Sequence, residues 1–387
     1  MLYSAFLIPI IISVIGILIF SKKIVIWELI TNIVVTCLII VGVFFIFKNS
    51  TISDSEYNSY LITETRYYEP WETYVHKTCY RTVSCGKNCT TTVAYDCSYC
   101  DYNPAYYELI DTGGNSFYVS QEEYNAYVNL WKHKKPEFVE LNRDINYYGG
   151  CGKDGDMYRV NWNGRIENSV ESTVNINYDN ILQTNHSAFD YPHISDEQAK
   201  KLGLYAYPEV NNYYQLNVLG LDKVNFPNKQ YFSKRINYMN GLYGKKYSCK
   251  VFVLLFKDKD INTAFKQEAY WDGGNRNEVV ICMGVKSNGD IEWVKPFSWT
   301  KNKILIPNLR EDIIQYKNLN NSENIIKSIE KNVIRYFKWR DFSNDFKYLT
   351  YEPTNTQIIV IYLLSIISSV LIMAWSIKND IDPYYKN

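Results

Sequence analysis

Cysteines are the residues of this chain whose type and spacing could do chemistry. Five of its nine cysteines fall between Cys79 and Cys100, and another follows at Cys151. Thiols at this density either form disulfides in an oxidising compartment or bind a metal such as zinc in a reducing one. The candidates for disulfide pairing are Cys79, Cys85, Cys89, Cys97, Cys100 and Cys151.

The spacing of these cysteines favours disulfides over zinc. A structural zinc site usually has two tight cysteine pairs separated by about 12–20 residues. Here only Cys97 and Cys100 form a tight pair; Cys85 and Cys89 are more widely spaced and lie close to that pair, with His76 as a spare ligand. We therefore predict disulfides, with no metal and no other cofactor, and keep a zinc site as the alternative.

A β-hairpin is predicted to position the first of these cysteines. Residues 79–85 and 89–97 are rich in β-branched and aromatic side chains, and residues 86–88 between them are turn formers. A tight loop of this kind sets Cys85 opposite Cys89, so that these two could bridge across the hairpin.

The remaining cysteines leave more than one arrangement open. Cys79 lies toward the far end of the second strand of the hairpin, within reach of Cys97 or Cys100. Cys249 and Cys282 fall on apolar segments much later in the chain. We interpret these two as buried thiols, because a bridge in the middle of a sheet is sterically awkward.

Three long apolar runs predict a membrane protein with three transmembrane helices. The runs extend from Leu2 to Phe20, from Ile24 to Phe47 and from Ile358 to Ile377. A helix of about 20 apolar residues crosses a hydrocarbon core of roughly 30 Å. The first two runs form a helical hairpin at the N-terminus, and the third run precedes a short C-terminal tail.

Basic residues predict the orientation of these spans. Lys22 and Lys23 form the tip of the hairpin, and basic tips remain in the cytoplasm. The N-terminus and the large domain are then outside the cytosol, and the tail at residues 378–387 is cytoplasmic. This placement agrees with disulfide formation, because the large domain reaches an oxidising compartment.

The region between the spans is predicted to have an α+β fold in three parts. Composition shifts divide the chain into a membrane hairpin, a Cys-rich β module with one helix, a loop-rich β connecting region, an α/β unit, a closing span and a tail. The membrane hairpin covers residues 1–47, with spans at 2–20 and 24–47, and the Cys-rich module covers residues 48–157. The connecting region covers residues 158–244 and the α/β unit residues 245–350. The closing span covers residues 358–377 and the tail residues 378–387.

The α/β unit is predicted from a βαβ pattern. The segment from Cys249 to Phe256 is a near-continuous apolar strand, of the kind that is buried on both faces. A helix from Asn262 to about Trp271 and a second apolar strand from Glu278 to Val285 follow it. Apolar residues between Ile325 and Phe337 recur at helical spacing and predict a further amphipathic helix.

One polar loop of this unit is a candidate ligand site. Asp272, Asn275, Asn277 and Glu278 gather around two glycines between the helix and the second strand. They could bind a cation or an anionic ligand, but an ordinary helix-to-strand connection with a glycine cap fits better. Ligands in α/β sheets usually lie at the carboxyl ends of strands, and this loop leads into an amino end.

The net charge of the chain indicates which kinds of binding partner it could attract. The formal net charge is zero, so no global field would attract nucleic acid. The predicted partners are the lipid bilayer and other membrane or surface proteins.

Several segments resemble an uncharacterised family of phage-encoded and bacterial membrane proteins with a Cys-rich extracytoplasmic domain. They are residues 67–71, the Cys-rich run through Cys97, and residues 250–256, 268–275 and 296–299. The resemblance covers most of the chain and implies one coherent protein without transferring an activity or a site. The last α/β unit is similar in topology to the TPM fold of small membrane-anchored domains with reported phosphatase activity.

Two functions fit these patterns. We expect a non-enzymatic envelope, surface or interaction protein that displays a disulfide-braced domain outside the cytosol. The alternative is a membrane-anchored, TPM-like hydrolase, which requires carboxylates that converge at one edge of the sheet. The candidates for such a site are Asp258, Asp260, Asp272 and Glu278.

Overall fold

The computed structural model of the chain divides into two compact units, each described by itself. The helical unit comprises Met1–Ser55, Asn177–Tyr191 and Asp341–Asn387, and the α+β unit comprises Glu56–Ile176 and Pro192–Arg340. The residues that the structure describes are 2–20, 24–86, 89–132, 135–141, 151, 155–185, 191–210, 212–213 and 216–379.

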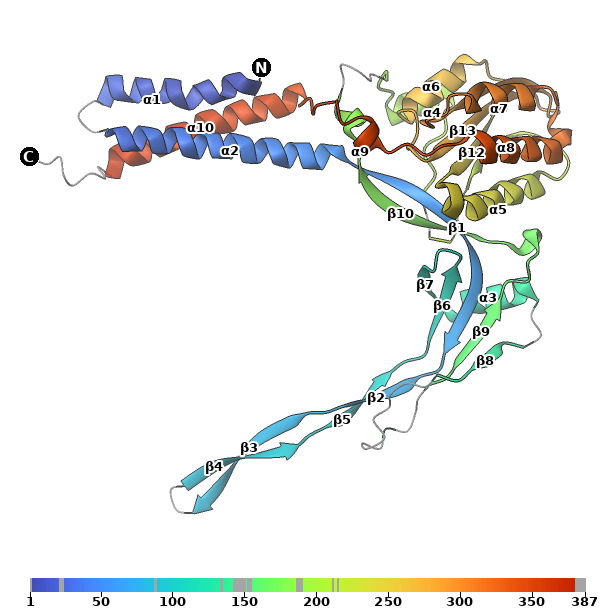
Figure 1. Cartoon of the computed structure of the whole chain (residues 1–387), viewed down its shortest axis with the longest axis horizontal. Coiled ribbons are helices and arrows are strands. Elements are labelled where there is room, and N and C mark those ends of the chain that lie inside the picture. The colour runs from blue at the N-terminus through green and yellow to red at the C-terminus, as the bar shows by residue number, and fades with distance from the viewer. Residues whose placement is uncertain are drawn as a thin grey trace, which may run out of the picture. The chain divides into compact units, whose positions relative to one another are not determined.

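Three apolar helices pack together in the helical unit. They are α1 (Leu7–Phe20), which follows the 3₁₀ turn η1 (Leu2–Phe6), α2 (Ile26–Ile52) and α10 (Asn355–Asn379). In Figure 1 these helices lie side by side. By length and composition α2 and α10 can cross a membrane, whereas the first apolar helix, Ser4–Phe20, is shorter. Two of the three predicted spans are thus present as full-length helices, and the first is not confirmed.

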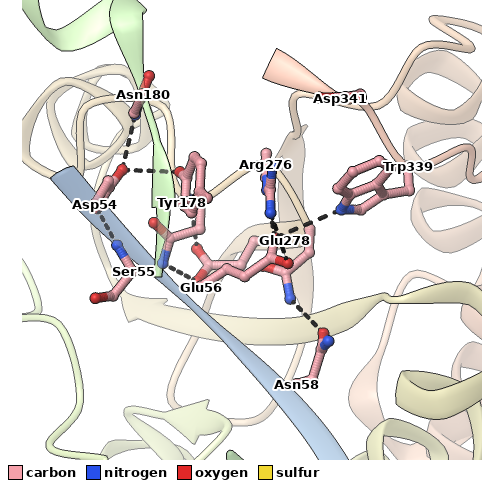
Figure 2. A network of polar contacts seen from close by, with 12 residues as sticks. Asp54, Ser55, Glu56, Asn58, Tyr178, Asn180, Arg276, Glu278, Trp339 and Asp341 are labelled. Atoms are coloured by element: carbon pink, nitrogen blue, oxygen red, sulfur yellow. Dashed lines mark hydrogen bonds and ion pairs between the residues drawn. The ribbon is translucent and has the colours of Figure 1, made fainter. Parts of the chain in front are cut away.

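A short polar cluster completes the helical unit where the chain leaves α2. The Asp54 carboxylate accepts hydrogen bonds from the Tyr178 hydroxyl at 2.8 Å and the Asn180 amide at 2.7 Å, as Figure 2 shows. The same unit contains the 3₁₀ turn η4 (Ile181–Thr184) and the short helix α9 (Phe342–Asp345). These contacts fix the first residues of the strand that follows α2.

A six-stranded sheet forms the first layer of the α+β unit. Its strand order is β7-β6-β1-β9-β8, with β10 also paired to β1. The helix α3 (Gln121–Trp131) packs against one face, where Tyr127 and Trp131 meet Ile62, Leu109 and Val160. The strands are β1 (Ser53–Tyr68), β6 (Tyr106–Asp111), β7 (Ser116–Val119), β8 (Glu137–Val139), β9 (Met157–Asn161) and β10 (Glu171–Asp179).

A two-stranded ribbon, which we call the arm (residues 71–103), connects β1 to β6. Near the sheet β2 (Trp71–Val75) pairs with β5 (Tyr99–Asn103), and beyond them β3 (Thr78–Gly86) pairs with β4 (Cys89–Asp96). Both pairs are antiparallel, and in Figure 1 the arm runs away from the six-stranded sheet of its own unit. The hairpin predicted for residues 79–97 is therefore confirmed. Its register differs at the tip, because a shift between Ser84 and Gly86 sets Gly86, and not Cys85 as predicted, opposite Cys89.

A four-stranded sheet with the order β11-β12-β13-β14 forms the second layer. Its strands are β11 (Val218–Leu219), β12 (Lys250–Lys257), β13 (Glu278–Val285) and β14 (Ile291–Phe297), and β14 alone of them runs antiparallel to its neighbour. The predicted βαβ unit is β12, α6 (Asn262–Tyr270) and β13.

Helices cover both faces of this second sheet. Side chains of β12 alternate: Val251, Val253 and Leu255 pack in one core with α5 (Lys229–Tyr247), α7 (Leu305–Ile314) and α8 (Ser322–Tyr336). The intervening residues of β12, among them Phe252, pack with α6 in the other core. This double coverage explains the continuous apolar sequence of β12. The remaining helix of the unit is α4 (Asp196–Leu202).

Two buried ion pairs join the two sheets of the α+β unit. Lys250, the first residue of β12, lies 2.9 Å from the Glu171 carboxylate of β10, and the two side chains are 0% and 1% exposed. The Lys250 ammonium also donates to the Ser59 hydroxyl at 2.6 Å. Hydrogen bonds therefore compensate part of the desolvation of both charges.

The second pair lies ahead of β13. The Arg276 guanidinium donates two hydrogen bonds to the Glu56 carboxylate, at 2.7 and 3.1 Å. The indole ring of Trp339 covers the guanidinium, with 4.6 Å between the guanidinium carbon and the ring centroid. Figure 2 shows this bidentate contact and the neighbouring Trp339.

We predict that Lys250→Met destabilises the α+β unit by about 3–5 kcal/mol, because it leaves the Glu171 charge buried without its partner. The double change Lys250→Met with Glu171→Leu should recover most of that loss. The control Lys286→Met removes the exposed pair with Glu292 and should cost less than about 1 kcal/mol. Urea unfolding followed by tryptophan fluorescence measures all three, and equal losses for the two single variants would contradict the prediction.

Candidate functional site

The arm presents an exposed surface with several tyrosines. Tyr80 is 72% exposed and Tyr102 is 59% exposed, and Val93, Tyr95 and Tyr99 are exposed as well. Tyrosine offers a large contact area at a small cost in side-chain entropy, so it is enriched at protein interfaces. The arm is therefore the candidate functional site, and the chemistry it supports is binding.

A disulfide braces the arm between its two strand pairs. Cys79 of β3 is bridged to Cys97, just after β4, and their Cα atoms are 5.7 Å apart. The Cys97 amide also donates to the Lys77 carbonyl at 2.9 Å. A ribbon of two strands is marginally stable in water by itself, which explains why this one needs a covalent brace.

A second disulfide joins Cys100 of β5 to Cys151 across 51 residues of sequence. Cys85 is disulfide-bonded too. The side chain of Cys89 lies outside the described residues, so the bridge between Cys85 and Cys89 stays a prediction. The zinc alternative is contradicted for Cys97 and Cys100, because the sulfur atoms it requires are held in disulfides.

Cys249 and Cys282 are free and buried, as the sequence predicted. Cys282 pairs in register with Leu254, well along β12 from Cys249, and the two thiols belong to different cores. Burial raises the pKa of both thiols far above the ordinary value. These cysteines are therefore unreactive parts of the hydrophobic core.

The arm is electrically neutral, and two of its charged side chains have close local contacts. Residues 71–103 carry three acidic and three basic side chains. The Arg81 guanidinium lies 5.6 Å from the centre of the Tyr95 ring. Ser98 donates to the Asp96 carboxylate from its hydroxyl and its amide, and these bonds lower the pKa of Asp96. A neutral, aromatic surface suits a protein partner better than a polyanion.

Of the four candidate ligand residues in the predicted polar loop, two contact each other. Asn275 donates to the Glu278 carboxylate from its amide N–H at 3.0 Å and from its side chain at 2.8 Å, and the Tyr207 hydroxyl donates at 2.5 Å. Asn277 instead donates to the Tyr57 carbonyl and to Asn58 of β1. Asp272 lies in the turn after α6, with a left-handed φ of 49°.

The contacts of this loop are those of a structural connection between α6 and β13. The Gly273 and Gly274 amides donate to the carbonyls of Glu268 and Trp271 and so cap the end of α6. Glu278 and Tyr207 are enclosed: burial raises the pKa of Glu278, and burial together with the nearby Glu278 charge raises the pKa of Tyr207. The carboxylate ties the loop to the start of β13.

The carboxylates required by the hydrolase alternative do not gather at one edge. Asp258 and Asp260 follow the carboxyl end of β12, whereas Glu278 begins the parallel strand β13 and therefore lies at the opposite edge. Among the residues that the structure describes, no group of three or more histidine, cysteine, aspartate or glutamate side chains could hold a metal ion.

Sequence reasoning missed the four residues of the buried ion pairs. One signal was available for Lys250, which directly precedes a run of six apolar residues in a strand buried on both faces. A strand that is buried on both faces also buries the side chain of its first residue. The position of Lys250 therefore indicates that its side chain is buried. Its partner Glu171 has no such signal.

A comparison with known proteins finds no matching protein family, no matching curated protein and no matching solved structure. The site is therefore interpreted from its own geometry.

We predict that removing the first disulfide loosens the arm alone. Changing Cys79 and Cys97 to serine removes a constraint across 18 residues of sequence, worth about 3 kcal/mol. Amide hydrogen exchange should accelerate at residues 78–96, while β1 and β6 keep their protection. Cys37→Ser, which removes a free cysteine, is the control, and unchanged exchange in the arm would refute a bracing role.

The raised pKa of Glu278 predicts a pH dependence. The folded state binds this proton more tightly than the unfolded chain, so its contribution to stability falls as pH rises from the ordinary pKa of 4.5. Glu278→Gln replaces the carboxyl group with a neutral amide, so the variant does not lose this stability as pH rises. The free energy of unfolding of the variant should therefore rise relative to the native chain as pH increases above about 4.5.

Urea titrations at several pH values measure this difference. Glu292→Gln, at a partly exposed residue of β14, removes one charge without the burial and serves as the control. If the difference in free energy of unfolding between Glu278→Gln and the native chain stays constant as pH increases above about 4.5, burial of Glu278 does not affect its ionisation.

Proposed function

We propose that this chain is a non-enzymatic, membrane-anchored protein that presents its disulfide-braced arm outside the cytosol to bind other proteins. The observation that carries the proposal is the combination of two disulfides, one within the exposed ribbon and one joining it to Cys151, with two helices long and apolar enough to cross a membrane. Disulfides persist in oxidising compartments, and an anchor keeps the binding surface at the membrane.

The surfaces of the long helices support a lipid environment. Leu38 and Ile46 on α2 and Leu371 on α10 are each more than 60% exposed. Trp27 near the start of α2 and Trp375 near the end of α10 are also largely exposed. Tryptophan at this level of a helix is typical of the boundary between lipid and water, so these side chains mark one surface of the bilayer.

The first helix fits as a third span. Five residues of 3₁₀ helix and fourteen of α-helix rise about 31 Å together, close to the thickness of a hydrocarbon core. The Asn32 side chain of α2 donates to Ser13 of α1 and to Ser369 of α10, both at 2.9 Å. An amide that bridges three helices is satisfied without water, as a membrane interior requires.

The proposed orientation follows from charge and redox chemistry. Lys22 and Lys23 are placed in the cytoplasm by the positive-inside rule, which directs α2 outward and α10 back inward. The α+β unit is then on the side where Cys79–Cys97 and Cys100–Cys151 can form. Both arguments give the same side of the membrane.

The chemistry of the arm indicates a protein partner in or near the same membrane. The exposed tyrosines supply contact area, and the disulfides reduce the entropy that the arm loses on binding. Since the arm is neutral, recognition depends on shape and aromatic contact.

Three cysteine variants test this topology. With a membrane-impermeant maleimide on intact cells, we expect labelling of Asn320→Cys, an exposed position of the α+β unit, and of Ser4→Cys at the start of the first span. Lys378→Cys should react only after the membrane is opened, because the positive-inside rule places it in the cytoplasm.

Each variant addresses a separate part of the proposal. If Asn320→Cys reacts only after permeabilisation, the large domain is cytosolic and the proposed function is wrong. If Ser4→Cys alone requires permeabilisation, the first helix does not cross and the anchor has two spans. Release of the protein by alkaline carbonate would contradict membrane integration altogether.

A further inference from the structure

The outer edge of β4 is open and lacks the usual protection of an edge strand. The described strands that pair with each other here are β3 and β4 alone, in a two-stranded sheet. Every side chain from Thr90 to Tyr95 is exposed, and none of them is charged. The backbone groups on the outer side of β4 are therefore available to another strand.

Soluble proteins normally protect such an edge with a charge, a proline or a covering element. The partner strand β3 follows this rule, since Arg81 stands in its middle. Thr90 to Tyr95 contain no proline and no glycine, and five of the six residues are β-branched or aromatic. These features give β4 a high tendency to pair with an additional strand. The other three strands of the arm do not combine them.

We propose that β4 pairs with β4 of a second copy of this chain, in an antiparallel arrangement that joins two arms into one four-stranded sheet. The proposal rests on the proposed function and names the partner of the arm. A second copy fits because antiparallel pairing of one strand with itself is two-fold symmetric, so both copies contribute the same surface.

The side chains of β4 match in this arrangement. With the two-fold axis at Thr92, that residue faces its own copy, Thr91 faces Val93 and Thr90 faces Ala94. Pairs of β-branched residues across strands are favourable, and no like charges meet. The pairing also extends the face on which Val93 and Tyr95 lie opposite Arg81 and Cys79 of β3.

Membrane anchoring strengthens a contact of this size. A pair of short strands buries much less than the roughly 1,200 Å² of a stable interface between free proteins. Two copies held in one bilayer have a high effective concentration, so a weak contact suffices there. We therefore expect pairing in membranes and dissociation on dilution in detergent.

Charge substitution on the two strands of the arm tests the proposal. Thr92→Lys places two lysine side chains directly opposite each other at the axis of the paired strands, with their Cβ atoms about 5 Å apart. Thr82→Lys is the matched control, because Thr82 lies directly opposite Thr92 on β3. In the four-stranded sheet the two substituted side chains of this control would be separated by three strand spacings, about 14 Å, beyond the screening length of roughly 8 Å at physiological salt.

The measurement is energy transfer between donor-labelled and acceptor-labelled full-length protein in phosphatidylcholine vesicles. We expect the native chain and Thr82→Lys to associate equally, and Thr92→Lys to associate roughly tenfold more weakly. Thr92→Cys should form a disulfide-linked dimer under mild oxidation at least several-fold faster than Thr82→Cys, with mass mapping to verify the native bridges.

Two results would overturn the pairing. Equal association of Thr92→Lys and the native chain shows that the edge of β4 is not in the contact, and equal cross-linking at positions 92 and 82 shows random collision. These outcomes are separable from a failure of the proposed function, because the labelling of Asn320→Cys reports the side of the membrane independently. An arm that is outside the cytosol but unpaired would leave binding of a different protein as its role.

Discussion

Two buried ion pairs determine how the two sheets of the α+β unit fit together. Lys250 and Arg276 stand at the amino ends of β12 and β13, and the carboxylates that neutralise them, Glu171 and Glu56, come from β10 and β1 of the other sheet. A charge buried without its partner costs several kcal/mol, so any packing that separates either pair is excluded. Hydrophobic contact alone would allow the sheets to slide, whereas these pairs select one register.

Sequence reasoning succeeded where neighbouring residues determine the structure. The hairpin of β3 and β4 and the order β12, α6, β13 both depend on residues close in the chain. The ion pairs join residues separated by 79 and 220 positions, and no local pattern encodes such a distance. The first apolar run showed a related limit, because composition gives its hydrophobicity but does not reveal that its first turn is a 3₁₀ helix.

The candidate site was predictable in its chemistry and less so in its geometry. Cysteine density indicated disulfides, and the pairing of Cys79 with Cys97 was one of two options that the hairpin left open. The partner of Cys100 lies 51 residues away, and its choice depends on the fold of the intervening chain. The polar loop resembled a ligand site in composition, yet its amides and carboxylate bond to one another because the helix end and the strand start require them.

The position of the arm in the sheet has a consequence for how this protein could change. β1 and β6 are neighbours whose pairing runs as far as Tyr68 and Tyr106, so the whole arm is a long connection between two adjacent strands. Longer or shorter connections change the entropy of loop closure only slightly. The arm can therefore be shortened, extended or exchanged without altering the register of the sheet, provided that Cys151 is removed together with Cys100 and no lone thiol is left behind.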